Sequence, residues 1–385
     1  MIHSSMKRLS LYPLLVGLMA CFFLSCSKTL SYDLPMAYSR QAAVFVATEN
    51  SSVISYHAET GNKLWEVSTS GVVEATPAFY IFKQFAYPDK QILYVITKTG
   101  YLHGIDVNSG KIISSKATGI LSANGIIVYN NNIYISADQL YCFGITNLNQ
   151  WWAYNGGGPC TSAPQVTGGR AYVAVGTQIH CVDVSNGTGV WQSGGTPAPI
   201  ESGVRMSNAT IYFGCTDGKV YAINEWDGSP KWNYAAGDKV QSSPIVYGGM
   251  CLVGSDDYSL HCIDTTTGLK RWTYPTKERV RSSPFIHATS ESVLVGSYDF
   301  NLYCIDHVSG ALRWKYPAAS LIKSSPVVLN NYVYFTSFDR YLYCVNLLNG
   351  SLVWKQFMNG NAQGSPVVDD LVNGIHPGDS GASPQ

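Results

Sequence analysis

Residues 280–314 read VRSSPFIHATSESVLVGSYDFNLYCIDHVSGALRW. The stretch contains four short apolar runs, rich in β-branched and aromatic residues and each closed by turn residues. Such runs are typical of β-strands. The same pattern recurs upstream and downstream with a period of about forty residues, which indicates an array of one supersecondary unit.

Each repeat is marked by an acidic or polar residue, a Gly four positions later and a Trp four positions after that, as in Asp306, Gly310 and Trp314. The acidic side chain can bond turn N–H groups and the Gly supplies positive φ. Each Trp is predicted to pack between neighbouring repeats. Of eight copies, the second has Ser114 at the Trp position, and the third has Gly144 and Leu148 at the first two positions. The predicted packing residues are Trp65, Trp152, Trp191, Trp232, Trp272, Trp314 and Trp354.

A Ser-Pro strand, best seen at Ser283-Pro284, also occurs eight times, in a degenerate form at Ala123-Asn124. The first Trp unit has no such strand before it, and the last such strand, residues 364–368, has no Trp unit after it. The C-terminal strand is therefore predicted to complete the N-terminal blade, which removes exposed sheet edges. The predicted fold is all-β, an eight-bladed β-propeller with four antiparallel strands per blade.

The N-terminal segment resembles an export signal. Lys7 and Arg8 precede an uncharged apolar run at residues 9–24, which is short for a transmembrane helix. The predicted organisation is a lipoprotein signal peptide at 1–25, a tether at 26–40, the propeller at 41–368 and a flexible tail at 369–385. Cys26 is the predicted lipidation site and membrane anchor. The alternative is an ordinary signal peptide with incidental cysteines.

The composition argues against several classes of function. The formal net charge is +0 and charged residues make up only 13%, so nothing indicates nucleic-acid binding. With 26 Tyr, the surface suits protein or glycan contacts instead. No nucleophile motif, P-loop, dinucleotide loop or metal-binding helix is present, so no catalytic residue, no metal site and no enzymatic activity are predicted.

One repeat position, two residues before the Ser of the inner strand, is mostly polar. If the inner strands line a central channel, these side chains form a collar at one mouth, on the same face as the loops that join the second and third strands. The collar is either a solvated rim or a binding site for a ligand or peptide. Its candidate residues are Glu74, Glu201, Gln241, Arg281, Lys323 and Gln363.

The second repeat carries an insertion at residues 80–88, where Phe82, Phe85 and Tyr87 form a candidate partner loop. These aromatic side chains either contact a partner or fold back on the blade.

The cysteines are not arranged as a metal site. Five of them share one repeat position that always holds a small residue, which indicates packing. The sequence does not decide whether two of Cys160, Cys215 and Cys251 form a disulfide.

The Ser-Ser-Pro, Leu-Tyr-Cys-Ile-Asp and Gly-x-x-x-Trp elements between residues 282 and 314 resemble the PQQ-like β-propeller repeat, and in length and export signal the chain resembles the BamB lipoprotein family. The resemblance implies a non-enzymatic scaffold that is lipid-anchored to the outer membrane and faces the periplasm, or is exported to the surface. Its expected partner is a component of the outer-membrane assembly machinery or another envelope protein. Residues 239–244 and 279–284 reproduce neither family contact to the partner BamA, an acidic Asp-x-Asp and a Leu/Arg-bearing loop.

Two other functions stay open. The first is a propeller that binds a small molecule or glycan, or acts as a sensor. The second and weaker one is a PQQ-dependent dehydrogenase; the quinoprotein branch carries an adjacent Cys-Cys pair that this sequence lacks, so neither PQQ nor another cofactor is expected.

Overall fold

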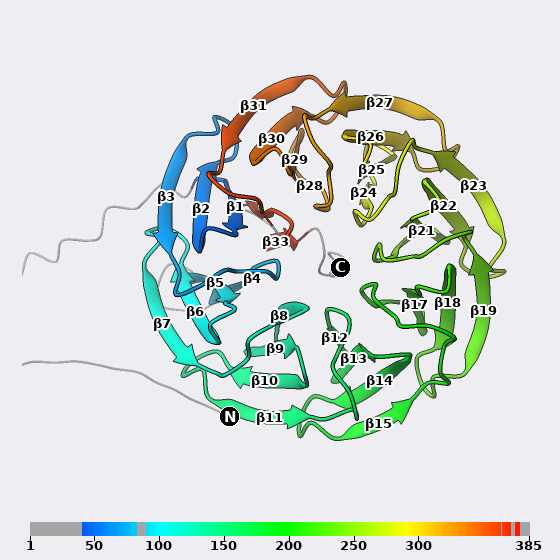
Figure 1. The fold of residues 1–385 in the computed structure, drawn as a ribbon, viewed down its shortest axis with the longest axis horizontal. Helices are drawn as coiled ribbons and strands as arrows, with labels where there is room; N and C mark the ends of the chain where they lie inside the picture. Colours follow the sequence, from blue (N-terminus) through cyan, green and yellow to red (C-terminus); the bar gives the residue numbers. More distant parts are fainter. Residues whose placement is uncertain (1–40, 83–89, 363, 371–373, 378–385) are drawn as a thin grey trace, which may run out of the picture. The chain divides into compact units, whose positions relative to one another are not determined.

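The structure is a computed structural model that describes residues 41–82, 90–362, 364–370 and 374–377. In this part of the chain every regular element is a β-strand, and eight antiparallel sheets are arranged as blades around a ring (Figure 1). No helix able to span a membrane occurs in these residues. The predicted eight-bladed propeller is confirmed.

Each blade is named by its order in the ring, and its strands are given from the channel outward. Blade 1 contains β32 (Val367–Asp370), β1 (Ala43–Thr48), β2 (Ser52–His57) and β3 (Lys63–Ser68). Blade 2 contains β4 (Ala78–Phe82), β5 (Lys90–Ile96), β6 (Tyr101–Asp106) and β7 (Ile112–Ala117). Blade 3 contains β8 (Gly125–Tyr129), β9 (Asn132–Ser136), β10 (Leu140–Gly144) and β11 (Gln150–Tyr154). Blade 4 contains β12 (Gln165–Thr167), β13 (Arg170–Val175), β14 (Gln178–Asp183) and β15 (Gly189–Gln192).

The second half of the ring repeats this order. Blade 5 contains β16 (Arg205–Ser207), β17 (Thr210–Gly214), β18 (Lys219–Asn224) and β19 (Pro230–Ala235). Blade 6 contains β20 (Ile245–Tyr247), β21 (Met250–Ser255), β22 (Ser259–Asp264) and β23 (Lys270–Pro275). Blade 7 contains β24 (Phe285–His287), β25 (Ser292–Gly296), β26 (Asn301–Asp306) and β27 (Leu312–Pro317). Blade 8 contains β28 (Val327–Leu329), β29 (Tyr332–Ser337), β30 (Tyr341–Asn346) and β31 (Leu352–Phe357).

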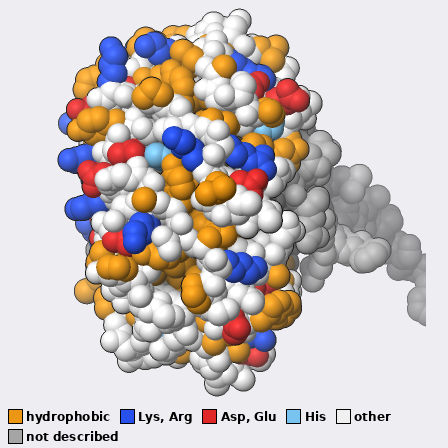
Figure 2. Space-filling view, turned by 90° about the vertical axis from the view of Figure 1, so that its right-hand side faces the viewer, with side chains coloured by type: hydrophobic (Ala, Val, Ile, Leu, Met, Phe, Trp, Pro, Cys, Tyr) orange, Lys and Arg blue, Asp and Glu red, His pale blue; other side chains and the backbone are white. Residues whose placement is uncertain are grey.

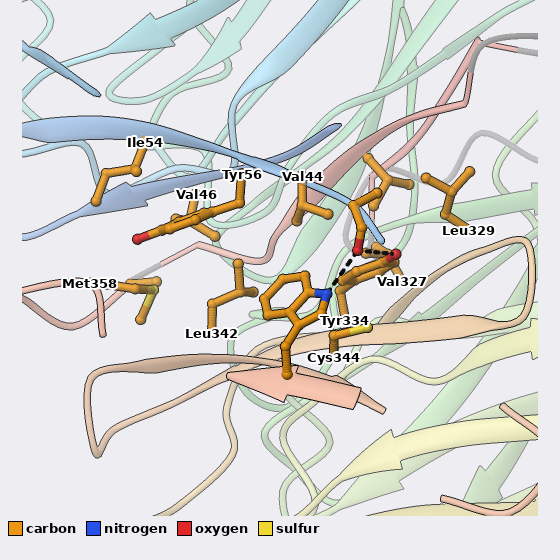
Figure 3. Packing of buried hydrophobic residues seen from close by; sticks show 14 residues of the cluster. Val44, Val46, Ile54, Tyr56, Val327, Leu329, Tyr334, Leu342, Cys344 and Met358 are labelled. Atoms are coloured by element: carbon orange, nitrogen blue, oxygen red, sulfur yellow. Dashed lines mark hydrogen bonds between the residues drawn. The ribbon is translucent and has the colours of Figure 1, made fainter. Parts of the chain in front are cut away.

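The ring closes through the C-terminal strand, as the repeat count predicted. β32 pairs antiparallel with β1, with Val367 opposite Phe45. Side chains of blades 1 and 8 then pack into one apolar cluster across the closure (Figure 3). The Tyr334 hydroxyl and the Trp354 indole N–H both donate to the Ala58 carbonyl, at 3.0 and 2.9 Å. Closure therefore uses the same inter-blade contacts as the rest of the ring.

The segment after the closing strand, predicted as a tail from residue 369, contains one more strand that the sequence pattern does not indicate. β32 runs to Asp370, and β33 (Gly374–Pro377) pairs antiparallel with it on the channel side. This fifth strand of blade 1 lies against β28 and β4. The inner edge of β32 still has unpaired backbone groups after closure, and an added strand can satisfy them. Residues 371–373 and 378–385 lie outside the described part.

All seven predicted Trp residues lie between adjacent blades. Each indole N–H donates to the backbone carbonyl of the second residue in the next blade's outer turn, the turn between its third and fourth strands. The seven pairs are Trp65–Val107, Trp152–Val184, Trp191–Glu225, Trp232–Thr265, Trp272–His307, Trp314–Leu347 and Trp354–Ala58. The turn Gly is needed for space as well as for φ, because a Cβ on Gly310 would lie 2.7 Å from the Trp272 ring.

The junction between blades 2 and 3 uses a different solution. Blade 2 has Ser114 where the other blades have Trp, and the outer turn of blade 3 has Leu148 where they have Gly. Leu148 adopts a positive φ of 54° and is buried in the apolar cluster between these two blades. The two departures belong together, because the missing indole leaves space that the Leu side chain fills.

Candidate functional site

The collar residues lie at one mouth of the central channel, because each precedes the inner strand of its blade. The structure places Glu74, Glu201, Gln241, Arg281 and Lys323 in the lining of a single cavity of about 990 Å³. Gln363 lies outside the described residues. The adjoining loops between second and third strands pack against the same segments; for example, the Tyr298 N–H donates to the Arg279 carbonyl at 2.9 Å. In blade 7, the loop between the second and third strands therefore contacts the segment that carries the collar residue.

The Ser-Ser-Pro motif positions the collar through two sets of hydrogen bonds. In blade 7, the first Ser acts within its own blade: the Gly296 N–H donates to Ser282 Oγ at 3.1 Å. The second Ser acts between blades: the Ser283 N–H donates to Ser325 Oγ at 3.0 Å. Sequence reasoning used the motif only to count strands. The repeated occurrence of two adjacent Ser residues could have indicated that the motif also forms hydrogen bonds within and between blades.

Inter-blade hydrogen bonds to Ser or Thr hydroxyls follow one another around part of the channel and are called the hydroxyl hoop. They join blades 5 to 6, 6 to 7, 7 to 8, 8 to 1 and 1 to 2, with donor–acceptor distances between 2.8 and 3.0 Å. The pairs are Gly203–Ser243, Ser243–Ser283, Ser283–Ser325, Ser325–Ser365 and Ser365–Thr76. At the next three junctions the acceptor position is Gly125, Ala163 or Gly203, none of which has a hydroxyl.

The register of blade 3 corrects the degenerate motif at Ala123-Asn124. Ile127 pairs with Tyr134 as Gln165 pairs with Tyr172 in blade 4, so Gly125 stands at the position of the second Ser. Four blades, 2 to 5, meet at the hydroxyl-free junctions. The cavity runs along β4, β8 and β12 of blades 2 to 4 and reaches Met206 in β16 of blade 5, whereas blades 6, 7, 8 and 1 line it only with residues that precede their inner strands. Within the described residues, the cavity therefore extends toward blades 2, 3 and 4.

Arg281 is held rigidly at the mouth. Its guanidinium donates to both carboxylate oxygens of Asp256, at 2.8 and 2.7 Å, and lies 5.5 Å from the centre of the Tyr298 ring. Asp256 is buried, and these hydrogen bonds raise the pKa of Arg281. A second cation, Arg279, approaches the same carboxylate at 3.8 Å. A bidentate pair fixes the direction of the guanidinium as well as its charge.

The remaining collar charges are distributed unequally around the ring. Glu74 pairs with Lys98 at 2.6 Å, and Glu201 accepts a hydrogen bond from the Gln241 amide. Lys323 is exposed, and no hydrogen bond or ion pair to it is found within the described residues. The mouth thus carries carboxylates on blades 2 and 5 and cations on blades 7 and 8. Such a surface can orient a partner that places its cations near blades 2 and 5 and its carboxylates near blades 7 and 8.

The repeat histidines have structural partners rather than a common site. His261 contacts Asp257 at 3.0 Å, and His180 Nδ1 lies 2.9 Å from the Tyr154 hydroxyl. Tyr303 occupies the same repeat position and donates to Asp299 at 2.6 Å. Polar-tipped aromatics at this position therefore connect a third strand to its own loop or to the preceding blade.

Other predicted sites are only partly described. Phe85, Tyr87 and Cys26 lie outside the described residues, and Phe82 enters only as the last residue of β4. The eight cysteines of the described part are buried and free, so Cys160, Cys215 and Cys251 form no disulfide here. Burial raises the pKa of Cys142 and Cys344 to about 12. No group of three or more metal-binding side chains was found in the same part of the chain.

Comparison with known proteins gives one family and two informative structures. The family model described as outer membrane protein assembly factor BamB matches residues 175–374. The computationally designed protein Ika8 is similar with a TM-score of 0.67 and 13% identity, covering 82% of this chain and 96% of that one. BamB from Moraxella catarrhalis is similar with a TM-score of 0.62 and 16% identity, covering 76% and 90%. At these identities the structures show the fold alone. No curated protein matches the sequence.

Proposed function

Because the chain belongs to the family described as outer membrane protein assembly factor BamB, we propose that it is a non-enzymatic, protein-binding scaffold of the cell envelope. A role in outer-membrane protein assembly is the specific form of this proposal. In it, Cys26 carries a lipid anchor and the propeller faces the periplasm from the outer membrane. The family and the fold support a protein-binding scaffold in the broad sense.

The observation that carries the proposed site is the preorganised collar at the channel mouth. Arg281 is fixed by a buried carboxylate, and Lys323 lies exposed on the neighbouring blade. Asp256 is shared by Arg281 and Arg279, so its single negative charge does not neutralise both arginines. Together with Lys323, this unneutralised positive charge favours a partner surface with carboxylates facing blades 7 and 8. Residues 239–244 and 279–284 lack the acidic motif expected from the family resemblance. We therefore propose a docking surface at the position used in the family but with different charges.

A second candidate function rests on the cavity itself. Its volume of about 990 Å³ is at the upper end of the range for small-molecule sites, and Tyr80, Ile127 and Tyr129 contribute apolar and hydroxyl-bearing side chains along one wall. A neutral, aromatic wall suits a glycan or a similar uncharged ligand. The absence of PQQ and of any other cofactor stays a prediction, to be tested by titration of the purified protein with PQQ and sugars.

The test of the scaffold proposal is site-specific photocrosslinking in the native membrane. A photoreactive amino acid at Lys323 should crosslink a protein partner, identified by mass spectrometry. The matched control is the same amino acid at Asn108, which is exposed in an outer turn on the opposite face. Crosslinks to an outer-membrane barrel protein from Lys323 but not from Asn108 would support the assembly role.

Two other results would count against it. Equal crosslinking from both positions would remove the collar as the docking site. If neither position yields a protein while the cavity binds a sugar, the ligand-binding function replaces the scaffold.

A further inference from the structure

The most exposed apolar side chains are concentrated on the face of the ring opposite the collar. In the described part of the chain, six large hydrophobic residues are more than 60% exposed. Five of them lie in or next to outer turns; Leu121, on the collar side, is the exception. The five are Trp151 (68%), Trp226 (65%), Leu269 (68%), Val308 (63%) and Leu348 (70%). Single exposed apolar residues are ordinary, but their gathering on one face is not.

Four of these residues come from four consecutive blades. Trp226, Val308 and Leu348 are the third residues of the outer turns of blades 5, 7 and 8, and Leu269 directly follows the turn Gly of blade 6. The outer strands of these blades, β19, β23, β27 and β31, are neighbours along one arc of the ring (Figure 1). These four residues are called the apolar tips. Figure 2 shows the rim over β19 and β23, where hydrophobic side chains lie among charged ones.

The turns hold the apolar tips in place. The N–H groups of Trp226, Val308 and Leu348 each donate to the carboxylate or amide oxygen of the residue that opens the turn, at 2.9, 3.1 and 2.9 Å. The turn itself does not require an apolar residue, because the other blades have polar ones at the same position. These are Glu59, Asn108, Thr146, Ser185 and Thr266. The apolar tips of blades 5–8 therefore have no evident role in folding.

The arginines beside the apolar tips are paired with acids of the same turns. Arg271 contacts Asp264 at 2.7 Å, and Arg313 contacts Asp306 at 2.6 Å. Neither guanidinium is left to attract an anionic partner. The binding partner that best matches this arc of the ring is therefore an apolar surface with little charge.

The chain also enters the ring on this face. β1 begins at Ala43, and the N–H of Ala58, in the outer turn of blade 1, donates to the Ala42 carbonyl at 2.8 Å. The apolar run at residues 9–24 and Cys26 precede this point in the sequence. The residues between Cys26 and the ring span at most about 50 Å when extended. An anchor at Cys26 would therefore join the ring from its outer-turn face, within that distance of the bilayer.

We propose that the apolar tips form a peripheral membrane-contact surface that rests on the interface of a zwitterionic bilayer. Trp favours the membrane interface, where its ring is buried and its N–H remains hydrated. The proposal rests on the envelope location proposed above. It leaves the collar on the opposite face free for a protein partner.

The test attaches the chain to vesicles without relying on natural lipidation. Residues 26–385, which contain the whole ring, are coupled through Cys26 to a maleimide phospholipid in phosphatidylcholine vesicles; the eight cysteines of the ring are buried. Vesicles with brominated acyl chains should then quench tryptophan fluorescence. Trp226→Phe should remove most of this quenching. Trp151→Phe, at an equally exposed tryptophan on blade 3, should retain it.

Replacement of Leu269, Val308 and Leu348 by Ser should also reduce the quenching, with the circular dichroism spectrum unchanged. Added phosphatidylglycerol should not alter it. The proposal is overturned if brominated lipid does not quench the attached protein, if Trp226→Phe leaves the quenching intact, or if quenching requires the anionic lipid. Because the anchor is supplied chemically, failure of natural lipidation would affect only the proposed location.

Discussion

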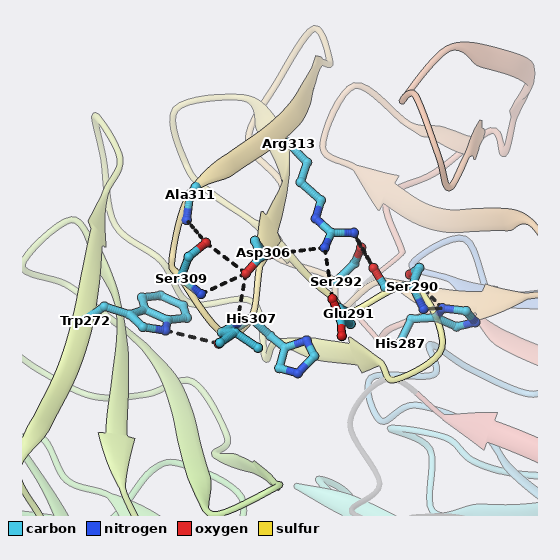
Figure 4. A network of polar contacts seen from close by, with 11 residues as sticks. Trp272, His287, Ser290, Glu291, Ser292, Asp306, His307, Ser309, Ala311 and Arg313 are labelled. Atoms are coloured by element: carbon cyan, nitrogen blue, oxygen red, sulfur yellow. Dashed lines mark hydrogen bonds and ion pairs between the residues drawn. The ribbon is translucent and has the colours of Figure 1, made fainter.

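The Trp272 indole nitrogen donates a 3.1 Å hydrogen bond to the His307 carbonyl, across the boundary between blades 6 and 7 (Figure 4). The acceptor lies in an outer turn fixed by Asp306, whose carboxylate accepts a 2.8 Å bond from the Ser309 N–H. One repeat therefore shapes the turn, and the previous repeat packs on it. This contact couples neighbouring blades and explains why the acidic residue, the Gly and the Trp recur together.

Trp272→Ala should lower the free energy of unfolding by about 3–5 kcal/mol, as expected for a large aromatic residue truncated in a packed contact. Denaturant unfolding followed by circular dichroism measures this. An unchanged midpoint would show that the indole contributes nothing to the docking of blades 6 and 7.

Gly310→Ala tests whether the turn Gly is needed for space. Gly310 has φ of 73°, and an added Cβ would lie 2.7 Å from the Trp272 ring. Strain in φ of about 1–2 kcal/mol and a clash of about 1–3 kcal/mol should both destabilise the variant. Gly168→Ala is the control, because Gly168 has φ of 55° and nothing within 4 Å of its added Cβ. Equal losses in the two variants would rule out the steric role.

Two truncations test the ring closure. Removal of residues 364–385 deletes β32 and exposes an edge of β1, so we expect aggregation. Removal of residues 371–385 deletes only β33 and should leave a soluble monomer. Light scattering after size exclusion distinguishes them. A soluble monomer from the longer truncation would contradict closure by the C-terminal strand.

The hydroxyl hoop predicts opposite effects at two equivalent positions. Ser325→Ala removes the acceptor of the Ser283 N–H and should destabilise the protein by about 1–2 kcal/mol. Residue 163 offers the Gly125 N–H no hydroxyl acceptor, because it is Ala. Ala163→Ser supplies that acceptor and should stabilise the ring by up to about 1 kcal/mol. Thermal and denaturant unfolding of both variants measure the effects. Destabilisation by both substitutions would contradict the hoop at the junction of blades 3 and 4.

Stability should fall as pH drops below the usual His pKa of about 6.5. Burial lowers the pKa of His103, His180 and His287 in the folded protein. The unfolded chain therefore binds more protons once pH falls below the usual His pKa of about 6.5. The contribution is complete above that pH and is lost as pH falls toward the folded-state pKa. His180→Gln should reduce the slope of unfolding free energy against pH; parallel curves would exclude a contribution from His180.

Much of the fold could be predicted from the sequence because the repeat is local. The Asp306–Gly310–Trp314 spacing, the turn residues and the alternation of strands are set within one unit. The count of units then required the C-terminal strand to close the ring. The collar could be placed for the same reason, since Arg281 and Lys323 occupy one position in a periodic structure. The sequence pattern does not indicate β33, because its pairing partner, the inner edge of β32, exists only after closure.

The repeat pattern was thus enough to predict the propeller, its closure and the mouth at which the collar lies. Three features depend on the folded ring: Leu148 replaces the indole missing at Ser114, Asp256 fixes Arg281, and the hydroxyls are missing at the junctions toward which the cavity extends. Each of these depends on contacts between segments 25 or more residues apart or between different blades. A repeat motif specifies what a position usually holds, whereas close packing across a blade junction decides which departures from it compensate one another.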